Sequence, residues 1–213
     1  MKHKLNKEYF DNIDIEEKAY WLGFIAADGC IYKMSKSAYR LQINLSIVDI
    51  DHLQKFNDCI ESDYNITTKN VNGNDTCTLK IACKQLTDGL MKHGITPKKS
   101  LVIEMPELRD DLYRHFIRGY FDGDGCITYN FDHLYPKMAF SIVGGESMLL
   151  SINDKMKQDL SIYACNHSQA LTLSTAKRDK ITEIYHYLYD DSTIYLERKK
   201  EKFDYLMSRL AEM

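Results

Sequence analysis

YWLGFIAADGCI at residues 20–31 and FIRGYFDGDGCI at residues 116–127 are two copies of one pattern. Each copy ends in Asp-Gly-Cys-Ile, and its aspartates, Asp28 and Asp124, are 96 positions apart. A repeat of this length is too long for a solenoid unit and suits a small subdomain. The sequence therefore predicts two similar halves packed face to face.

Hydrophobic periodicity predicts the elements around each copy. Asp14 and Glu17 resemble a capping box that opens the helix carrying the first motif, and Gly29 is placed to end it. Residues 40–48 and 76–84 alternate between apolar and polar side chains, which is typical of half-buried strands with one polar face. The other expected elements are a helix over 51–60, a strand around 138–142, a helix over 147–160, strands near 161 and 171, and a helix over 178–189.

These elements predict an α+β fold with pseudo-two-fold symmetry. Each half would contain a helix, two strands, a second helix, two more strands and a third helix. Pro97 and Pro106 interrupt the regular patterns in the middle of the chain. We therefore expect the two halves to be residues 1–105 and 106–213.

Small residues recur four apart along each motif helix, at Gly23 and Ala27 in the first and at Gly119 and Gly123 in the second. Such strips let two backbones approach closely, so we expect the two helices to pack along them. The motif aspartates would then meet at the helix C-terminal ends, where the helix dipoles and mutual repulsion disfavour negative charge. A hard divalent cation with oxygen ligands would compensate, and Mg²⁺ held by carboxylates, water and phosphate suits phosphodiester cleavage.

Composition narrows the class of protein only a little. The 213 residues are 44% hydrophobic and contain no apolar run of the ~20 residues that a membrane span requires. The polar start of the chain does not resemble a signal peptide, and the six cysteines include no CxxC pair. A cytoplasmic protein, or one of an organellar matrix or an infected host cell, is expected. Because the formal net charge is −3, with 28 basic and 31 acidic residues, nucleic-acid binding must depend on local patches.

Residues 21–29 and 117–125 resemble the two motif copies of single-chain LAGLIDADG homing endonucleases, and the resemblance covers nearly the whole chain. It implies two αββαββα halves, each with a four-stranded antiparallel sheet, that form a saddle over DNA with the motif helices at the centre. The implied activity is site-specific cleavage of both strands of a long asymmetric DNA target with a divalent metal, leaving short 3′ overhangs. One chain already holds both motifs, so a monomer is expected, encoded by an intron or another mobile element.

The resemblance also implies a metal site. In the family the last acidic residue of each motif binds the catalytic metal, Mg²⁺ or Mn²⁺, and this role carries over to Asp28 and Asp124. The glycines that follow them, Gly29 and Gly125, are included in the expected metal site.

Basic residues near the scissile phosphates are a further implication of the resemblance. Lys99 and Lys199 occupy matching basic segments and would stabilise the charge at phosphorus or position the attacking water. Asp49 and Gly144 fall near a position that often holds a polar, water-positioning group. The other motif acid is present only in the second copy, as Asp122, and this position is not a metal ligand in the family.

The polar faces of the expected strands supply donors and acceptors suited to the edges of bases in the major groove. Any solvent-exposed sheet face is polar, but a face left uncovered by helices favours a partner. The residues expected to contact DNA are Lys33, Arg40, Gln42, Asn44, Ser46, Lys69, Thr76, Thr78 and Lys80 in the first half, and Thr128, Asn130, Lys137, Asn166, His167, Thr172 and Ser174 in the second.

Two alternatives keep this fold without DNA cleavage: a maturase that binds intron RNA, and a DNA-binding regulator. Regulators of this type usually lose the motif acids and add a helix-turn-helix, and the sequence shows neither feature. A hydrolase of small phosphoesters is disfavoured because no glycine-rich phosphate loop or histidine–carboxylate metal cluster is visible. An intein is not expected either, since the ends of the chain lack a splicing nucleophile and asparagine.

Overall fold

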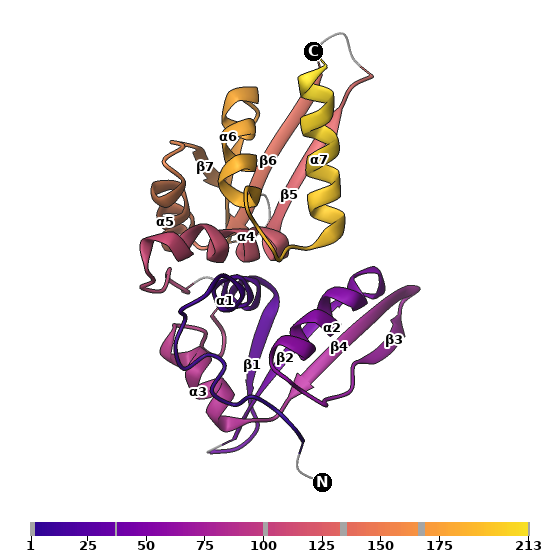
Figure 1. Ribbon diagram of the computed structural model, residues 1–213, viewed down its shortest axis with the longest axis vertical. Coiled ribbons are helices and arrows are strands. Elements are labelled where there is room, and N and C mark those ends of the chain that lie inside the picture. Colours follow the sequence, from indigo (N-terminus) through magenta and orange to yellow (C-terminus); the bar gives the residue numbers. More distant parts are fainter. Residues whose placement is uncertain (1–2, 37, 100–101, 133–135, 166–168, 213) are drawn as a thin grey trace.

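The computed structural model describes residues 3–36, 38–99, 102–132, 136–165 and 169–212. Two similar repeats are stacked along the long axis of the molecule, and α1 and α4 lie between them (Figure 1). The first repeat contains α1 (Glu16–Asp28), β1 (Gly29–Lys33), β2 (Tyr39–Ser46), η1 (Ile47–Asp49), α2 (Ile50–Cys59), β3 (Thr67–Val71), β4 (Asn74–Ile81) and α3 (Lys84–Lys92). The second contains η2 (Asp110–Leu112), α4 (Tyr113–Asp124), β5 (Gly125–Asn130), β6 (Lys137–Gly144), α5 (Glu146–Met156), β7 (Ser161–Ala164), β8 (Leu171–Thr175), α6 (Arg178–Tyr189) and α7 (Glu197–Ala211).

The predicted α+β architecture is confirmed, and one helix is added to it. Both repeats follow the order αββαββα, and α7 then extends the second repeat beside β5 (Figure 1). The sheets have the strand orders β1-β2-β4-β3 and β5-β6-β8-β7, with every pairing antiparallel. None of the helices in the described part of the chain is long and apolar enough to cross a bilayer.

Alternation along the strands divides each sheet into an apolar face and a polar face. In the first sheet, Leu41 pairs with Ile81 and Ile43 with Leu79, and all four side chains are buried. Helices α2 and α3 pack on this sheet, so the apolar face forms the core of the repeat. The second repeat places Phe140, Ile142 and Leu173 in the same way.

The ends of α1 differ from the prediction. No capping box forms: Ile15 is the N-cap residue without a side-chain cap, and Asp14 accepts a hydrogen bond from Lys18 instead. Gly29 does not adopt the left-handed conformation of a helix-ending glycine, since its φ of −80° is extended and it begins β1. Glycine is required there for space, because a Cβ atom would lie 2.5 Å from the Cγ2 atom of Ile25.

The backbones of α1 and α4 come into close contact where the small residues of the two helices face each other. A Cβ atom on Gly23 would lie 1.9 Å from the carbonyl oxygen of Phe116, and one on Gly119 would lie 2.0 Å from that of Tyr20. At the C-terminal end, a Cβ atom on Gly123 would lie 2.3 Å from the Cβ atom of Ala27. No side chain larger than hydrogen fits at the three glycines, which fixes the position of one helix on the other.

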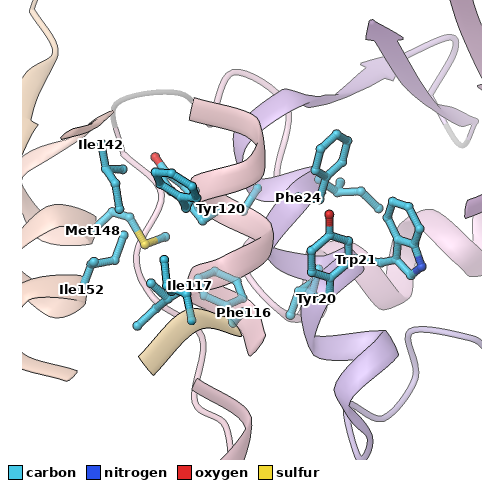
Figure 2. Packing of buried hydrophobic residues seen from close by; sticks show 14 of the residues in the cluster. Tyr20, Trp21, Phe24, Phe116, Ile117, Tyr120, Ile142, Met148 and Ile152 are labelled. Atoms are coloured by element: carbon cyan, nitrogen blue, oxygen red, sulfur yellow. The ribbon is translucent and has the colours of Figure 1, made fainter. Parts of the chain in front are cut away.

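The large side chains of these helices are buried within the two repeats (Figure 2). Trp21 and Phe24 lie on the first-repeat side, whereas Tyr120 and Ile117 point toward Met148 and its neighbours in the second repeat (Figure 2). Helix α1 therefore contributes to the core of the first repeat and α4 to the core of the second. The C-terminal ends of the two helices are held side by side.

Candidate active site

Asp28 and Asp124 are the last residues of α1 and α4, and the helix contact brings them together. A Cβ atom on Gly123, next to Asp124, would lie 3.4 Å from Oδ2 of Asp28. Burial raises the pKa of Asp28 to about 6, and the negative charge of Asp124 acts in the same direction. Asp124 is exposed by surface area, yet the surrounding protein displaces enough water to raise its pKa as well. The site thus holds two adjacent carboxylates whose charges are unfavourable in the absence of a cation.

Lys99 and Lys199 occupy equivalent places at the ends of the two motif helices. The Nζ atom of Lys99 donates to the carbonyl oxygens of Ala26 at 2.6 Å and Ala27 at 3.3 Å. The Nζ atom of Lys199 donates to the carbonyl oxygens of Phe121 at 2.8 Å, Gly123 at 3.0 Å and Gly125 at 2.6 Å.

These carbonyls include the last ones of each helix, which have no partner within the helix and carry its partial negative charge. Lys99 is 4% exposed and Lys199 is 8% exposed, and burial lowers the pKa of both. The nearby aspartates oppose that shift, because a negative charge favours the ammonium form. The two lysines thus neutralise the helix ends beside the aspartates.

The carboxylate oxygens of Asp28 and Asp124 are suitable ligands for a hard cation that keeps part of its water shell. In the described residues no group of three or more histidine, cysteine, aspartate and glutamate side chains is arranged to hold a metal. Mg²⁺ is commonly coordinated by one or two carboxylates together with waters and substrate phosphate, and Asp28 and Asp124 match the carboxylate part of such a ligand set. The place of Gly29 and Gly125 in the metal site stays a prediction; the carbonyl oxygen of Gly125 accepts a hydrogen bond from Lys199. For Gly29 and Gly125 the geometry gives a steric role, because a Cβ atom on either would meet the preceding helix turn.

Arg198 is a residue of the site that the sequence analysis did not assign. Its Nε and Nη2 atoms donate to the two carboxylate oxygens of Asp49, at 2.7 and 2.9 Å. Asp49 is 5% exposed and lies at the end of η1, so this ion pair joins α7 of the second repeat to the first repeat. The matching position in the second repeat is Gly144, where a Cβ atom would lie 2.6 Å from the hydroxyl of Tyr120. The surroundings of the two aspartates are therefore not equivalent.

The polar face of the first sheet gathers most of the residues expected to contact DNA. The strand register places Gln42 beside Lys80, Asn44 beside Thr78 and Ser46 beside Thr76. Others on this face are Arg40 and Lys69, together with Tyr32 and Thr67, which the sequence analysis did not name. Lys33 departs from the expected pattern: it follows Ile31 by two residues, so it shares the side of Ile31, opposite the polar face.

The second sheet has a matching polar face. Thr128, Asn130, Lys137, Thr172 and Ser174 share one side, as the register shows. Thr172 is only 9% exposed, and its hydroxyl lies 2.9 Å from the sulfur of Cys165. Ser141, Ser161 and Tyr163 lie on the same face and were not named in advance. The expected contacts Asn166 and His167 lie outside the described residues.

Both polar faces begin at the site. Strand β1 starts at Gly29, directly after Asp28, and β5 starts at Gly125, directly after Asp124. Cys30 pairs with Gln42, and Cys126 pairs with Ser141. The first strand of each sheet therefore begins next to one motif aspartate, and the polar face of the sheet extends away from it.

Comparison with known proteins identifies the fold. No protein-family model matches the sequence, and no curated protein is significantly similar to it in sequence. Solved structures do match. The LAGLIDADG homing endonuclease I-LtrWI bound to target DNA superimposes with a TM-score of 0.66 at 14% identity, over 97% of this chain and 92% of that one.

Two further matches are of the same kind. I-GzeII in complex with its DNA target gives a TM-score of 0.64 at 14% identity over 87% of both chains. I-AabMI bound to uncleaved DNA gives 0.62 at 11% identity over 91% of both chains. Together with the repeated motif and the order of elements, these matches show that the chain has the fold of the LAGLIDADG homing endonucleases.

Proposed function

We propose that this protein is a homing endonuclease that cleaves both strands of a long, asymmetric duplex DNA target with Mg²⁺ or Mn²⁺, leaving short 3′ overhangs. The observation that carries the proposal is the pair Asp28 and Asp124, held side by side at the ends of two helices whose backbones are in close contact. Two unlike halves meet at this pair, which suits a target without symmetry.

Asp28 and Asp124 would hold the metal. A bound divalent cation would supply positive charge against the phosphate oxygens and activate water for attack. The raised pKa of Asp28 reflects burial next to a second carboxylate, and positive charge between the two would relieve both effects. The two carboxylates would therefore already be adjacent before the cation binds.

The two lysines would differ in what they offer the substrate. An ammonium group has three donors. Lys199 uses all three on backbone carbonyls, so it would act as a fixed positive charge beside the α4 end. Lys99 uses two on partners among the described residues, so its third N–H would be offered to a phosphate oxygen or the attacking water. We propose this stabilisation of developing negative charge as their role in hydrolysis.

The polar sheet faces would read the DNA on both sides of the cleavage site. Arg40, Lys69, Lys80 and Lys137 would neutralise phosphates or bind guanine edges, and the neutral amides and hydroxyls between them would contact other bases. Since one chain carries both aspartates and both sheets, a monomer would suffice for double-strand cleavage.

The test is cleavage of a randomised duplex library in Mg²⁺ by the wild type, Asp28→Asn and Asp124→Asn, with sequencing of the cut ends. The surface variant Asp58→Asn is the matched control, because Asp58 is exposed on α2. We expect one long site with short 3′ overhangs, cut by the wild type and the control and by neither motif variant. Tight binding of duplex DNA or structured intron RNA without cleavage would overturn the proposal in favour of a regulator or a maturase.

A further inference from the structure

Asp122 is a buried carboxylate in the last turn of α4, and it is only 1% exposed. Its Oδ2 atom accepts hydrogen bonds from the hydroxyl of Tyr20 at 2.8 Å and the backbone N–H of Leu196 at 2.7 Å. Its Oδ1 atom accepts a hydrogen bond from the hydroxyl of Tyr189 at 3.2 Å. A buried carboxylate persists only when such donors replace water, so the three contacts explain how Asp122 is tolerated.

The contact with Leu196 determines where α7 begins. Leu196 is the N-cap residue of α7, its backbone is extended, and no side chain caps the helix from within. The N–H groups of Lys199 and Lys200 bond back to the carbonyl of Leu196 at 3.0 and 3.1 Å. The carboxylate of Asp122 therefore holds the residue from which the first turn of α7 starts.

That first turn carries two side chains of the candidate active site. Arg198 reaches Asp49, and Lys199 reaches the three carbonyls at the end of α4. Each lies within three residues of Leu196, so a shift at Leu196 would move both. Long side chains hold such positions only when their backbone is fixed.

The described residues of the first repeat show no equivalent anchor. Position 26 is alanine where the second repeat has Asp122, and Lys99 follows a loop in which Lys98 has a positive φ of 63°. Lys99 thus reaches the end of α1, and within the part of the chain that the structure describes no carboxylate holds its backbone. Loss of Asp122 would therefore act through Lys199 and Arg198, while the backbone that carries Lys99 would keep its position.

We propose that Asp122 is a positioning residue for DNA hydrolysis, which holds the start of α7 so that Lys199 and Arg198 stand beside the two motif aspartates. This inference rests on the proposed nuclease function. A merely structural carboxylate would lower stability and slow cleavage of both strands alike. A positioning role instead predicts that the strand served by Lys199 is affected most.

The first measurement is strand-resolved, single-turnover cleavage by Asp122→Ala, with Lys199→Ala and Lys99→Ala to assign the strands. Lys199→Ala identifies the strand whose cleavage depends on Lys199. We expect Asp122→Ala to slow cleavage of that strand about tenfold or more, and cleavage of the other strand less than about threefold. Equal slowing of both strands would overturn the proposal. Should Asp122→Ala fail to fold, Asp122→Asn replaces it, because the amide keeps one acceptor oxygen and should show the same strand preference to a smaller extent.

The second measurement is hydrogen exchange of the backbone amides at residues 196–200, which does not depend on cleavage. Tyr189→Phe is the matched control, since it removes one hydrogen bond from Asp122 and leaves the Leu196 contact in place. We expect about tenfold or more loss of protection in Asp122→Ala and less than about threefold in Tyr189→Phe. Unchanged protection in Asp122→Ala would overturn the proposal. If the wild type cuts no DNA, the nuclease function fails, while the exchange data still decide whether Asp122 holds α7.

Discussion

Arg198 binds both carboxylate oxygens of Asp49, at 2.7 and 2.9 Å, across the boundary between the two repeats. Asp49 is 5% exposed, whereas the Arg198 side chain is about half exposed. Removing the guanidinium would leave a buried carboxylate without its partner, which is more costly than losing a surface pair. We expect Arg198→Ala to lower the free energy of unfolding by about 2 kcal/mol, measured by urea denaturation.

The double variant Asp49→Asn/Arg198→Ala should recover part of the lost free energy of unfolding, because it also removes the unpaired negative charge of Asp49. Arg109→Ala is the control: Arg109 makes a similar two-point contact with Asp111, but both groups are fully exposed. No measurable change is expected there. A coupling energy near zero between Asp49 and Arg198 would show that the pair does not stabilise the junction.

Gly119 lies where the motif helices touch, and it should tolerate no side chain. A Cβ atom there would lie 2.0 Å from the carbonyl oxygen of Tyr20 and 2.8 Å from the backbone nitrogen of Phe24. Both atoms belong to helix backbone, so neither can move without separating α1 from α4. We expect Gly119→Ala to lower the free energy of unfolding by about 3 kcal/mol or more, or to prevent folding.

Gly89→Ala provides the matched control on a helix. Its Cβ atom would lie 3.2 to 3.3 Å from Phe10, a tight contact without overlap, and alanine favours the helix by about 1 kcal/mol. That variant should stay within about 1 kcal/mol of the wild type. Wild-type stability in Gly119→Ala would contradict the close approach of the two motif helices.

Most of the fold could be predicted from the sequence because the signals for its strands and motif helices are local, whereas α7 was not predicted. Apolar alternation at Leu41, Ile43 and Leu45 marks β2, and the same pattern marks β4, so their pairing face followed directly. The repeat then implied that the two motif helices meet, which brings Asp28 and Asp124 together. The structure bounds α6 at Arg178–Tyr189, as the sequence predicts.

The remaining features depend on partners far apart in the chain. Arg198 and Asp49 are 149 residues apart, and Tyr20 and Asp122 are 102 apart, so no periodicity points from one to the other. Lys33 lies on the side of Ile31 because residues two apart in a strand share a face, and its charge alone does not indicate that face. The capping box failed because Asp14 pairs with Lys18 rather than with the backbone.

The burial of Asp28 beside a second carboxylate predicts how stability depends on pH. The pKa of Asp28 is about 6 in the folded protein, above its ordinary value of 3.8, so folding favours the protonated form. The stability that this group contributes is complete below pH 4 and is lost as the pH rises through 6. In EDTA at pH 7.5, Asp28→Asn should therefore be more stable than the wild type by about 2 kcal/mol, a figure reduced for partial exposure. At pH 4 the difference should vanish.

Addition of Mg²⁺ should reverse this order. A cation that binds only the folded wild type raises its Tm in proportion to the logarithm of the cation concentration, and Asp28→Asn should not respond. Asp58→Asn serves as the control and should follow the wild type in both experiments. A wild-type Tm that is unchanged by Mg²⁺ and Mn²⁺ would argue against a metal held by the two aspartates.

Two lysines of the first sheet distinguish its two faces. Lys80 lies on the polar face beside Gln42, whereas Lys33, which is also exposed, lies on the side of Ile31. If the polar face binds DNA, Lys80→Ala removes one phosphate or base contact and Lys33→Ala removes none. We expect Lys80→Ala to raise the Kd for duplex DNA about three- to tenfold in EDTA and to reduce the slope of log K against log salt by about 1. Equal effects of the two variants would contradict DNA binding across the polar face.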